Sequence, residues 1–255
     1  DLVMIVSIII MLIVALIVIA LWVSAVQQHK EKQEAERRKE LTKQKKIIEE
    51  AEDVLLNSAN IPMSENILRI IQRRIYDALV SMVELSPSSK ELKNRLKESK
   101  ERLASPIEAN NSDALALPDN DKQLIALIQG IKKLRAVLRS EHGKGKVDSQ
   151  VFVAEDKRLE KLQLRINVES QIKRGISARS ANMVGSARQY FEKALATLTS
   201  VSYSDEYVNS KRQEVEGYLE TISSELKASN ATSLKKKAEQ EQDDLDVLFA
   251  PKKKW

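Results

Sequence analysis

The N-terminal stretch that decides the fold covers residues 2–26 and reads LVMIVSIIIMLIVALIVIALWVSAV. It contains no charge, no proline and no glycine. At about 1.5 Å per residue, a helix of this length spans roughly 37 Å, which exceeds the roughly 30 Å hydrocarbon core of a bilayer. A soluble helix does not need an apolar surface all the way round. We therefore interpret residues 1–26 as a transmembrane helix that crosses a membrane once.

Charges that follow the apolar run predict its orientation. Basic residues close to a membrane span stay on the cytoplasmic side. We expect the N-terminus outside and the remaining chain in the cytoplasm, at the inner membrane of a bacterium, with Trp22, Lys30 and Lys32 at the membrane interface. The basic residues within about 20 positions of the span are Lys30, Lys32, Arg37, Arg38, Lys39, Lys43, Lys45 and Lys46.

A cleaved signal peptide is the alternative interpretation of the same stretch, because Val23-Ser24-Ala25 resembles a small-residue cleavage site. Two features oppose it. No basic segment precedes the apolar run, and the run is longer than the usual 7–15 residues of a signal peptide. The chain contains no cysteine, which fits a reducing compartment and excludes a disulfide framework.

Composition predicts an all-α fold, because helix-forming residues dominate and only six glycines and five prolines occur in 255 residues. Residues 27–57 are expected to form a charged helical stalk that continues the membrane helix. Glutamates there precede basic residues by three or four positions, as in Glu34 with Arg38 and Glu40 with Lys43. Such pairs stabilise a helix that contacts nothing else.

Residues 61–104 predict a helical hairpin. Ser64 is a candidate N-cap, and Ser86-Pro87-Ser88-Ser89 is a short stop and restart that makes the two helices antiparallel. Apolar residues of the first helix recur with a helical period. They are Ile67, Ile70, Ile71, Ile75, Ala78, Leu79, Met82 and Val83.

Residues 105–120, which contain Pro106 and Pro118, are expected to form a linker. Asp119 or Asp121 is the expected cap of the next helix. Four helices then fill residues 121–227, with a chain reversal near Asn182 to Gly185, and residues 228–255 are expected to be a disordered tail. The fold class is thus a membrane helix, a stalk and antiparallel helical hairpins.

Two segments, residues 76–87 and 192–203, repeat the same order of amphipathic helix and serine-rich turn. The second copy resembles a tetratricopeptide repeat. Gly175 precedes Ala187 by twelve residues, and Ala187, Phe191 and Ala194 follow the small–large–small order of that family. The first helix departs from the family, which favours Trp, Leu and Tyr at the positions that Gln171, Arg174 and Ala178 occupy here.

The resemblance implies a protein-binding groove, and the alternative is a generic helical bundle with the same spacing. If the groove is present, it lies around residues 174–218. A second contact is expected in the acidic and apolar tail. The predicted partner-binding residues are Arg174, Ala178, Tyr190, Tyr207, Tyr218, Leu245, Leu248 and Phe249.

The tail segment Leu245-Asp-Val-Leu-Phe249 is similar to sliding-clamp-binding peptides of bacterial replication proteins, but it lacks their leading glutamine. Three further interpretations stay open: the segment binds another protein, docks back onto the domain, or lets Lys252 to Lys254 and Trp255 rest on anionic lipid.

No constellation of residues predicts catalysis, a metal site or a bound cofactor. The two histidines, His29 and His142, lack partners at metal-ligand spacing. Residues 143–146 read GKGK, which lacks the spacing of a phosphate loop. Glu155 and Asp156 are expected on a solvated helix face. We therefore do not expect an enzyme.

The sequence favours a membrane-anchored cytosolic scaffold that recruits a protein partner. The alternative is a membrane tether for nucleic acid or a DNA-associated protein. It would use the C-terminal motif and the basic helices. No aromatic stacking platform accompanies these basic residues, which argues against nucleic-acid binding. A self-associating coiled coil through residues 27–56 is opposed by the lack of a sustained apolar seam, and self-association is left open. The basic residues of the tether hypothesis are Lys132, Lys133, Arg135, Arg139, Lys144 and Lys146.

Overall fold

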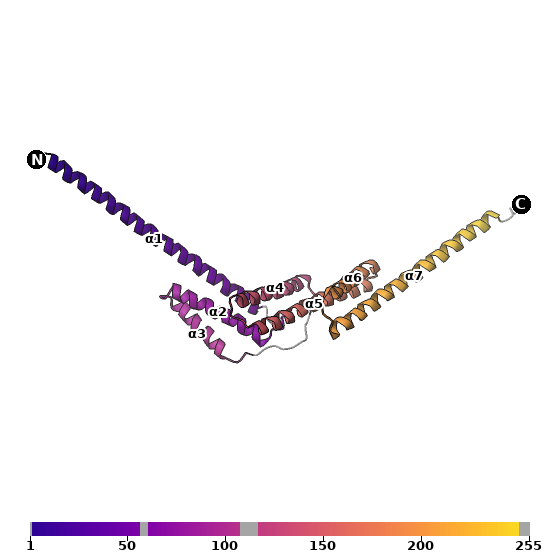
Figure 1. Cartoon of the computed structure of the whole chain (residues 1–255). Helices are drawn as coiled ribbons and strands as arrows, with labels where there is room; N and C mark the ends of the chain where they lie inside the picture. The colour runs from indigo at the N-terminus through magenta and orange to yellow at the C-terminus, as the bar shows by residue number, and fades with distance from the viewer. Residues whose placement is uncertain (1, 57–60, 108–116, 250–255) are drawn as a thin grey trace. The chain divides into compact units, whose positions relative to one another are not determined.

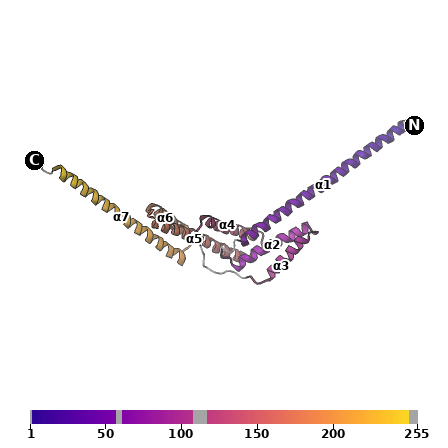
Figure 2. The same ribbon diagram turned by 180° about the vertical axis from the view of Figure 1, so that it is seen from behind.

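A computed structural model describes the backbone of residues 2–56, 61–107 and 117–249, and the side chains of these ranges through Asp243. Within these residues the chain forms helices and no strand (Figures 1 and 2), which confirms the all-α prediction. The helices are α1 (Leu2–Leu56), α2 (Glu65–Leu85), α3 (Lys90–Ala104), α4 (Asp121–Gly143), α5 (Ser149–Ser180), α6 (Val184–Ser200) and α7 (Glu206–Phe249).

The chain divides into two compact units, and the division runs through α4 and α5. The first unit comprises the described residues within 1–116 and 129–156, and the second those within 117–128 and 157–255. The sequence instead predicts one domain over residues 121–227. The difference arises because α4 approaches the start of the first hairpin, where a Cβ added to Gly130 would lie 3.0 Å from Ile61 Cδ1.

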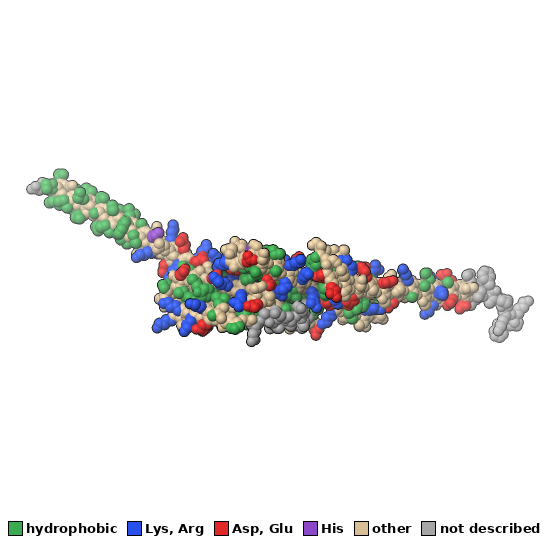
Figure 3. Space-filling model, turned by 60° about the horizontal axis from the view of Figure 1, so that its bottom comes forward, with side chains coloured by type: hydrophobic (Ala, Val, Ile, Leu, Met, Phe, Trp, Pro, Cys, Tyr) green, Lys and Arg blue, Asp and Glu red, His purple; other side chains and the backbone are tan. Residues whose placement is uncertain are grey.

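Helix α1 carries the apolar run on its N-terminal half. Every described side chain from Leu2 to Lys39 is exposed, and Figure 3 displays the apolar half as an almost uniformly hydrophobic surface. By length and composition, α1 is the one helix in the described ranges that is long and apolar enough to cross a membrane. The predicted charged stalk is helical, and Arg38 lies 3.4 Å from Glu34 within it.

The C-terminal end of α1 belongs to the core of the first unit. Ile48, Ala51 and Val54 are at most 3% exposed, and α2 packs against them. Arg37 Nη1 lies 3.4 Å from the carbonyl oxygen of Leu85, the last residue of α2, and donates a hydrogen bond to it. Helix α2 therefore runs back along α1 in the antiparallel sense.

Side-chain caps delimit the first hairpin where the sequence predicts a stop and a restart. Ser64 Oγ accepts a hydrogen bond from the Ile67 amide at 3.2 Å, and Ser89 Oγ accepts one from Leu92 at 3.3 Å. At α4, by contrast, Asn120 Oδ1 accepts from the Lys122 amide, so neither Asp119 nor Asp121 is the cap.

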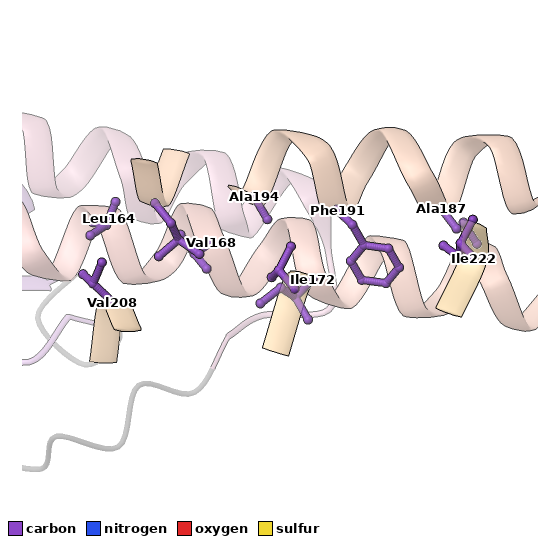
Figure 4. Close-up of a cluster of buried hydrophobic side chains, with 11 residues drawn as sticks. Leu164, Val168, Ile172, Ala187, Phe191, Ala194, Val208 and Ile222 are labelled. Atoms are coloured by element: carbon purple, nitrogen blue, oxygen red, sulfur yellow. The ribbon is translucent and has the colours of Figure 1, made fainter. Parts of the chain in front are cut away.

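The core of the second unit is formed by one face each of α5, α6 and α7 (Figure 4). Its fully buried side chains include Val168, Phe191 and Val215. Helix α7 then continues beyond this core as a single helix to Phe249, where the sequence predicts disorder from residue 228. Its lysine, glutamate, glutamine and alanine residues are good helix formers, which favours a continued helix although the described side chains from Ser223 to Asp243 are exposed. Residues 250–255 lie outside the described part of the chain.

Candidate functional site

The turn between α5 and α6 places these helices against each other, where the sequence predicts a chain reversal. Asn182 has a φ of 63°, a left-handed conformation that asparagine tolerates better than most side chains. The Met183 amide donates to the Ala178 carbonyl at 2.9 Å, and the Asn182 amide donates to Arg179 at 3.0 Å. These bonds satisfy carbonyls at the end of α5 and allow α6 to begin at Val184.

Close contact between α5 and α6 depends on Gly175. A Cβ added there would lie 2.7 Å from Cε1 of Phe191, so only a hydrogen fits between the α5 backbone and the aromatic ring. Ala187 and Ala194, one turn to either side of Phe191, are completely buried. Tyr218 of α7 stacks on Phe191 with ring centroids 4.7 Å apart. Small residues thus let the backbones approach while the aromatic rings fill the space between the helices.

The start of α7 is held by Asp205. Its Oδ1 accepts a hydrogen bond from the Val208 amide at 2.9 Å, and its Oδ2 accepts one from Lys161 of α5 at 2.9 Å. The amide of Val208, and then the ammonium group of Lys161, hold the pKa of Asp205 below its ordinary value. The carboxylate is therefore both the cap of α7 and a link to α5.

A polar cluster lies between α5 and α7. The Tyr207 hydroxyl donates to Glu169 at 3.0 Å, and Lys211 Nζ lies 3.3 Å from the same carboxylate. The guanidinium of Arg165 lies 5.3 Å from the centre of the Tyr207 ring. Burial, and secondly the charge of Glu169, raise the pKa of Tyr207, so its hydroxyl stays protonated and acts as a donor. The cluster therefore fixes the relative register of α5 and α7.

The predicted partner-binding residues are spread over three helices. Arg174 of α5 is half-exposed and donates to Asp121 of α4 at 2.7 Å. Tyr190 on α6 and Tyr207 and Tyr218 on α7 are half-buried. Ala178 is 4% exposed and belongs to the core, so its side chain is not available to a partner. A small residue there lets the end of α5 approach α6, which is a packing role.

The predicted tail contacts, Leu245, Leu248 and Phe249, have helical backbone within α7, but their side chains lie outside the described residues. At the other end of the chain, the predicted membrane-interface residues Trp22 and Lys30, together with Lys32, are exposed on α1. Trp22 is 71% exposed and lies within the apolar run, four residues before its end.

Two carboxylates predicted to be solvated are instead part of the packed structure. Glu155 is 6% exposed, and Asp156 accepts hydrogen bonds from Arg135 at 2.8 and 3.1 Å. The guanidinium of Arg135 holds the pKa of Asp156 below its ordinary value. Sequence spacing placed both on a charged helix, but only the tertiary contact of α4 with α5 shows which side of α5 is covered.

Three of the six basic residues in the nucleic-acid hypothesis form ion pairs with neighbouring carboxylates. The remaining three are exposed on α4: Lys132, Lys133 and Arg139. The ion pairs join Arg135 to Asp156 (2.8 Å), Lys144 to Glu141 (3.2 Å) and Lys146 to Asp77 (2.5 Å). Figure 3 likewise displays basic and acidic side chains interspersed on the surface in view. An extended nucleic-acid backbone is bound best by a long, continuous stripe of cations, and these carboxylates interrupt such a stripe, which weakens the tether hypothesis.

The fold and these contacts define a class: an all-helical protein with one candidate membrane-spanning helix and a tightly packed three-helix unit. Comparisons with known proteins found no family model, no curated protein and no solved structure that this chain matches.

Proposed function

We propose that this protein is a membrane-anchored scaffold that recruits a protein partner to the cytosolic face of a bacterial inner membrane. The observation that carries the proposal is the continuity of α1. One unbroken helix contains the exposed apolar run and ends in buried Ile48, Ala51 and Val54. If one end of this helix lies in a bilayer and the other packs in a core, the folded part of the chain is held at the membrane.

The proposed orientation rests on the basic residues that directly follow the apolar run. They lie on α1 after the apolar run, and each of them is exposed. With this orientation, both helical units face the cytosol.

The proposed partner surface consists of the exposed parts of α5, α6 and α7 around Tyr190 and Arg174. A tetratricopeptide-like hairpin is supported by the contact of Gly175 with Phe191 and by the burial of Ala187 and Ala194. Ile176 on α5 is 42% exposed, although it is apolar and lies one residue from this contact. Half-exposed aromatic and aliphatic side chains on rigid helices are typical anchors for a protein partner.

Site-specific photo-crosslinking tests the proposed surface. A benzoylphenylalanine replaces Tyr190 or Ile176 in the full chain, in membranes of its native cells, and irradiation should give a discrete adduct at each position. The matched control position is Val153 of α5, which is apolar and 61% exposed but lies in the first unit. The proposal fails if Tyr190 and Ile176 give no adduct, or only those that Val153 gives.

The same crosslinked adducts test whether the C-terminal tail contacts the partner. Deleting residues 239–255 should remove a subset of them if the acidic and apolar segment is a second contact, while adducts from Tyr190 persist. If the deletion changes nothing, the tail is not part of the binding surface.

A further inference from the structure

A polar cavity lies in the first unit where the C-terminal end of α4 meets α1 and α2. Its volume is about 300 Å³, at the lower end of the range for small-molecule sites. Ile47 and Ala78 supply its apolar lining. The charged side chains that line it are Lys43, Arg74, Asp77, Glu141, Lys144 and Lys146. We propose that this cavity binds a small, soluble anion that carries more than one phosphate group.

The lining has an excess of positive charge. Four basic residues and two carboxylates line the cavity, a formal excess of +2 in the lining, and outside the lining Glu40 lies 3.7 Å from Nζ of Lys43. Glu141 is 2% exposed and lies 2.5 Å from Nη1 of Arg74 and 3.2 Å from Nζ of Lys144. The carboxylate thus holds two cations in place at the cavity. Pre-positioned guanidinium and ammonium groups are the usual ligands of phosphate in proteins.

Arg74 is the most buried of these cations, with 11% of its side chain exposed. Its Nη1 donates to Glu141 and Ser140, whereas its buried Nε makes no hydrogen bond within the described chain. Because this Nε is closed off from solvent, a ligand in the cavity meets the positive charge of the Arg74 guanidinium without a hydrogen bond to Nε.

A second cavity of about 310 Å³ shares Glu141 and Lys146 with the first, and Arg69 and Arg73 of α2 contribute to its lining. Arg73 Nε lies 3.8 Å from Asp77, and the same carboxylate forms an ion pair with Lys146. The two cavities therefore adjoin at Glu141 and Lys146. An elongated ligand with several phosphates can contact both.

Three carbonyls at the end of α4 accept hydrogen bonds from the amides that follow, which reduces their repulsion of an anion. The Lys144 amide donates to Ser140, the Gly145 amide to His142 and the Lys146 amide to Glu141. Gly145 has a φ of 72°, which permits this tight reversal. Because these carbonyls are already bonded, the negative end of the helix dipole is partly screened.

Distance from the membrane favours a soluble ligand over a lipid headgroup. Lys43 follows the end of the apolar run by 17 positions, which corresponds to about 26 Å along α1. A headgroup at the bilayer surface does not reach so far, and charges at this separation are screened at physiological salt.

Calorimetric titration of the full chain in zwitterionic nanodiscs tests the site, with sodium tripolyphosphate and ATP as probes and sulfate as the single-anion comparison. We expect saturable binding of at least one polyphosphate, weakened about tenfold or more in the double variant Lys43→Gln/Lys144→Gln, because two charge-assisted contacts are lost. The matched control, Lys97→Gln/Lys100→Gln, removes two exposed lysines from α3 and should bind like the parent chain.

Three results would overturn the proposal. The first is the absence of saturable binding at millimolar probe, and the second is equal weakening in both double variants. The third is loss of tripolyphosphate binding in nanodiscs of anionic lipid at matched ionic strength, which would assign the cavity to a lipid headgroup. Circular dichroism of each variant verifies that helix content and melting are unchanged. Lys144→Arg keeps the positive charge that Lys144→Gln removes, so it should bind the probe like the parent chain.

Discussion

At the scale of single residues, Gly175 is the position where α5 comes closest to α6. The Phe191 ring that it contacts is fully buried and stacks on Tyr218, so it has little freedom to move. The spacing of Gly175, Ala187, Phe191 and Ala194 predicted which small and large residues meet. Ala178, which the sequence predicts as a contact residue, is buried, because spacing alone does not reveal which side of α5 the other helices cover.

Gly175→Ala should destabilise the second unit by about 1–2 kcal/mol. Overpacking against Phe191 disfavours the folded state by about 1–3 kcal/mol, and the better helix propensity of alanine offsets up to about 1 kcal/mol. Hydrogen exchange in the full chain measures this loss of stability, and the α6 amides of the variant should exchange roughly tenfold faster than those of the parent.

Gly217→Ala is the matched control for that substitution. Gly217 lies in α7, and a Cβ added there has no neighbour within 4 Å. Alanine has the better helix propensity, so this variant should be more stable by about 0.5–1 kcal/mol. Its amides should therefore exchange more slowly than those of the parent chain. Equal effects of the two substitutions would contradict the close approach at Gly175.

Asp205 makes the stability of the second unit depend on pH. Its pKa is lower in the folded chain than its ordinary value of 3.8, so its ionised form stabilises the fold above that pH. The contribution is lost as the pH falls through 3.8 toward the folded value. Asp205→Asn keeps a capping oxygen but removes the charge, so its α6 and α7 amides should exchange faster than the parent's at pH 6.5 and converge with it near pH 3.

Lys161→Gln separates the two partners of Asp205. If the Lys161 ion pair supplies part of the effect, the double variant should be less destabilised than the sum of the single variants. A difference between parent and Asp205→Asn that stays constant from pH 6.5 to 3 would refute the assigned cause.

At the scale of elements, the helical periods predicted α2 and its buried face well. Ile67, Ile71 and Ile75 are buried as expected, and Ser64 caps the helix. Periodicity is informative there because one face is apolar and the other charged. It is not informative in α7 between Lys227 and Asp243, where apolar residues do not recur with a helical period and the polar sequence predicts disorder. Helix propensity, without packing, is the signal that favours a helix at that place.

Deleting residues 228–255 should leave the second unit as stable as in the parent chain. Every described side chain from Ser223 to Asp243 is exposed, so the deleted segment contributes little to the core. The α6 amides should retain their hydrogen-exchange rates within about threefold, well below the effect of a lost core contact. Deletion from Tyr218 onward, which removes the stacked ring and buried Ile222, should by contrast expose α6 to rapid exchange.

At the scale of the whole chain, α1 joins an apolar run to a helical body without a break. The apolar run, the charged stalk and the two hairpin patterns were all readable from the sequence. The division into two units was not, because it depends on where α4 and α5 make long-range contacts such as the 2.5 Å pair of Arg74 with Glu141. Those contacts join residues 67 positions apart, and no local pattern predicts them.

Single-cysteine labelling tests most directly whether the helical body is held on the cytosolic side. The chain has no native cysteine, so Ser88→Cys in the exposed α2–α3 turn and Ser229→Cys on exposed α7 each introduce a single thiol. In intact bacteria, a membrane-impermeant maleimide should label neither variant, while a known external thiol reacts. Both should react once the membrane is permeabilised, and both should sediment with membranes. Labelling of either thiol in intact cells, or recovery of the chain in the soluble fraction, would contradict the account.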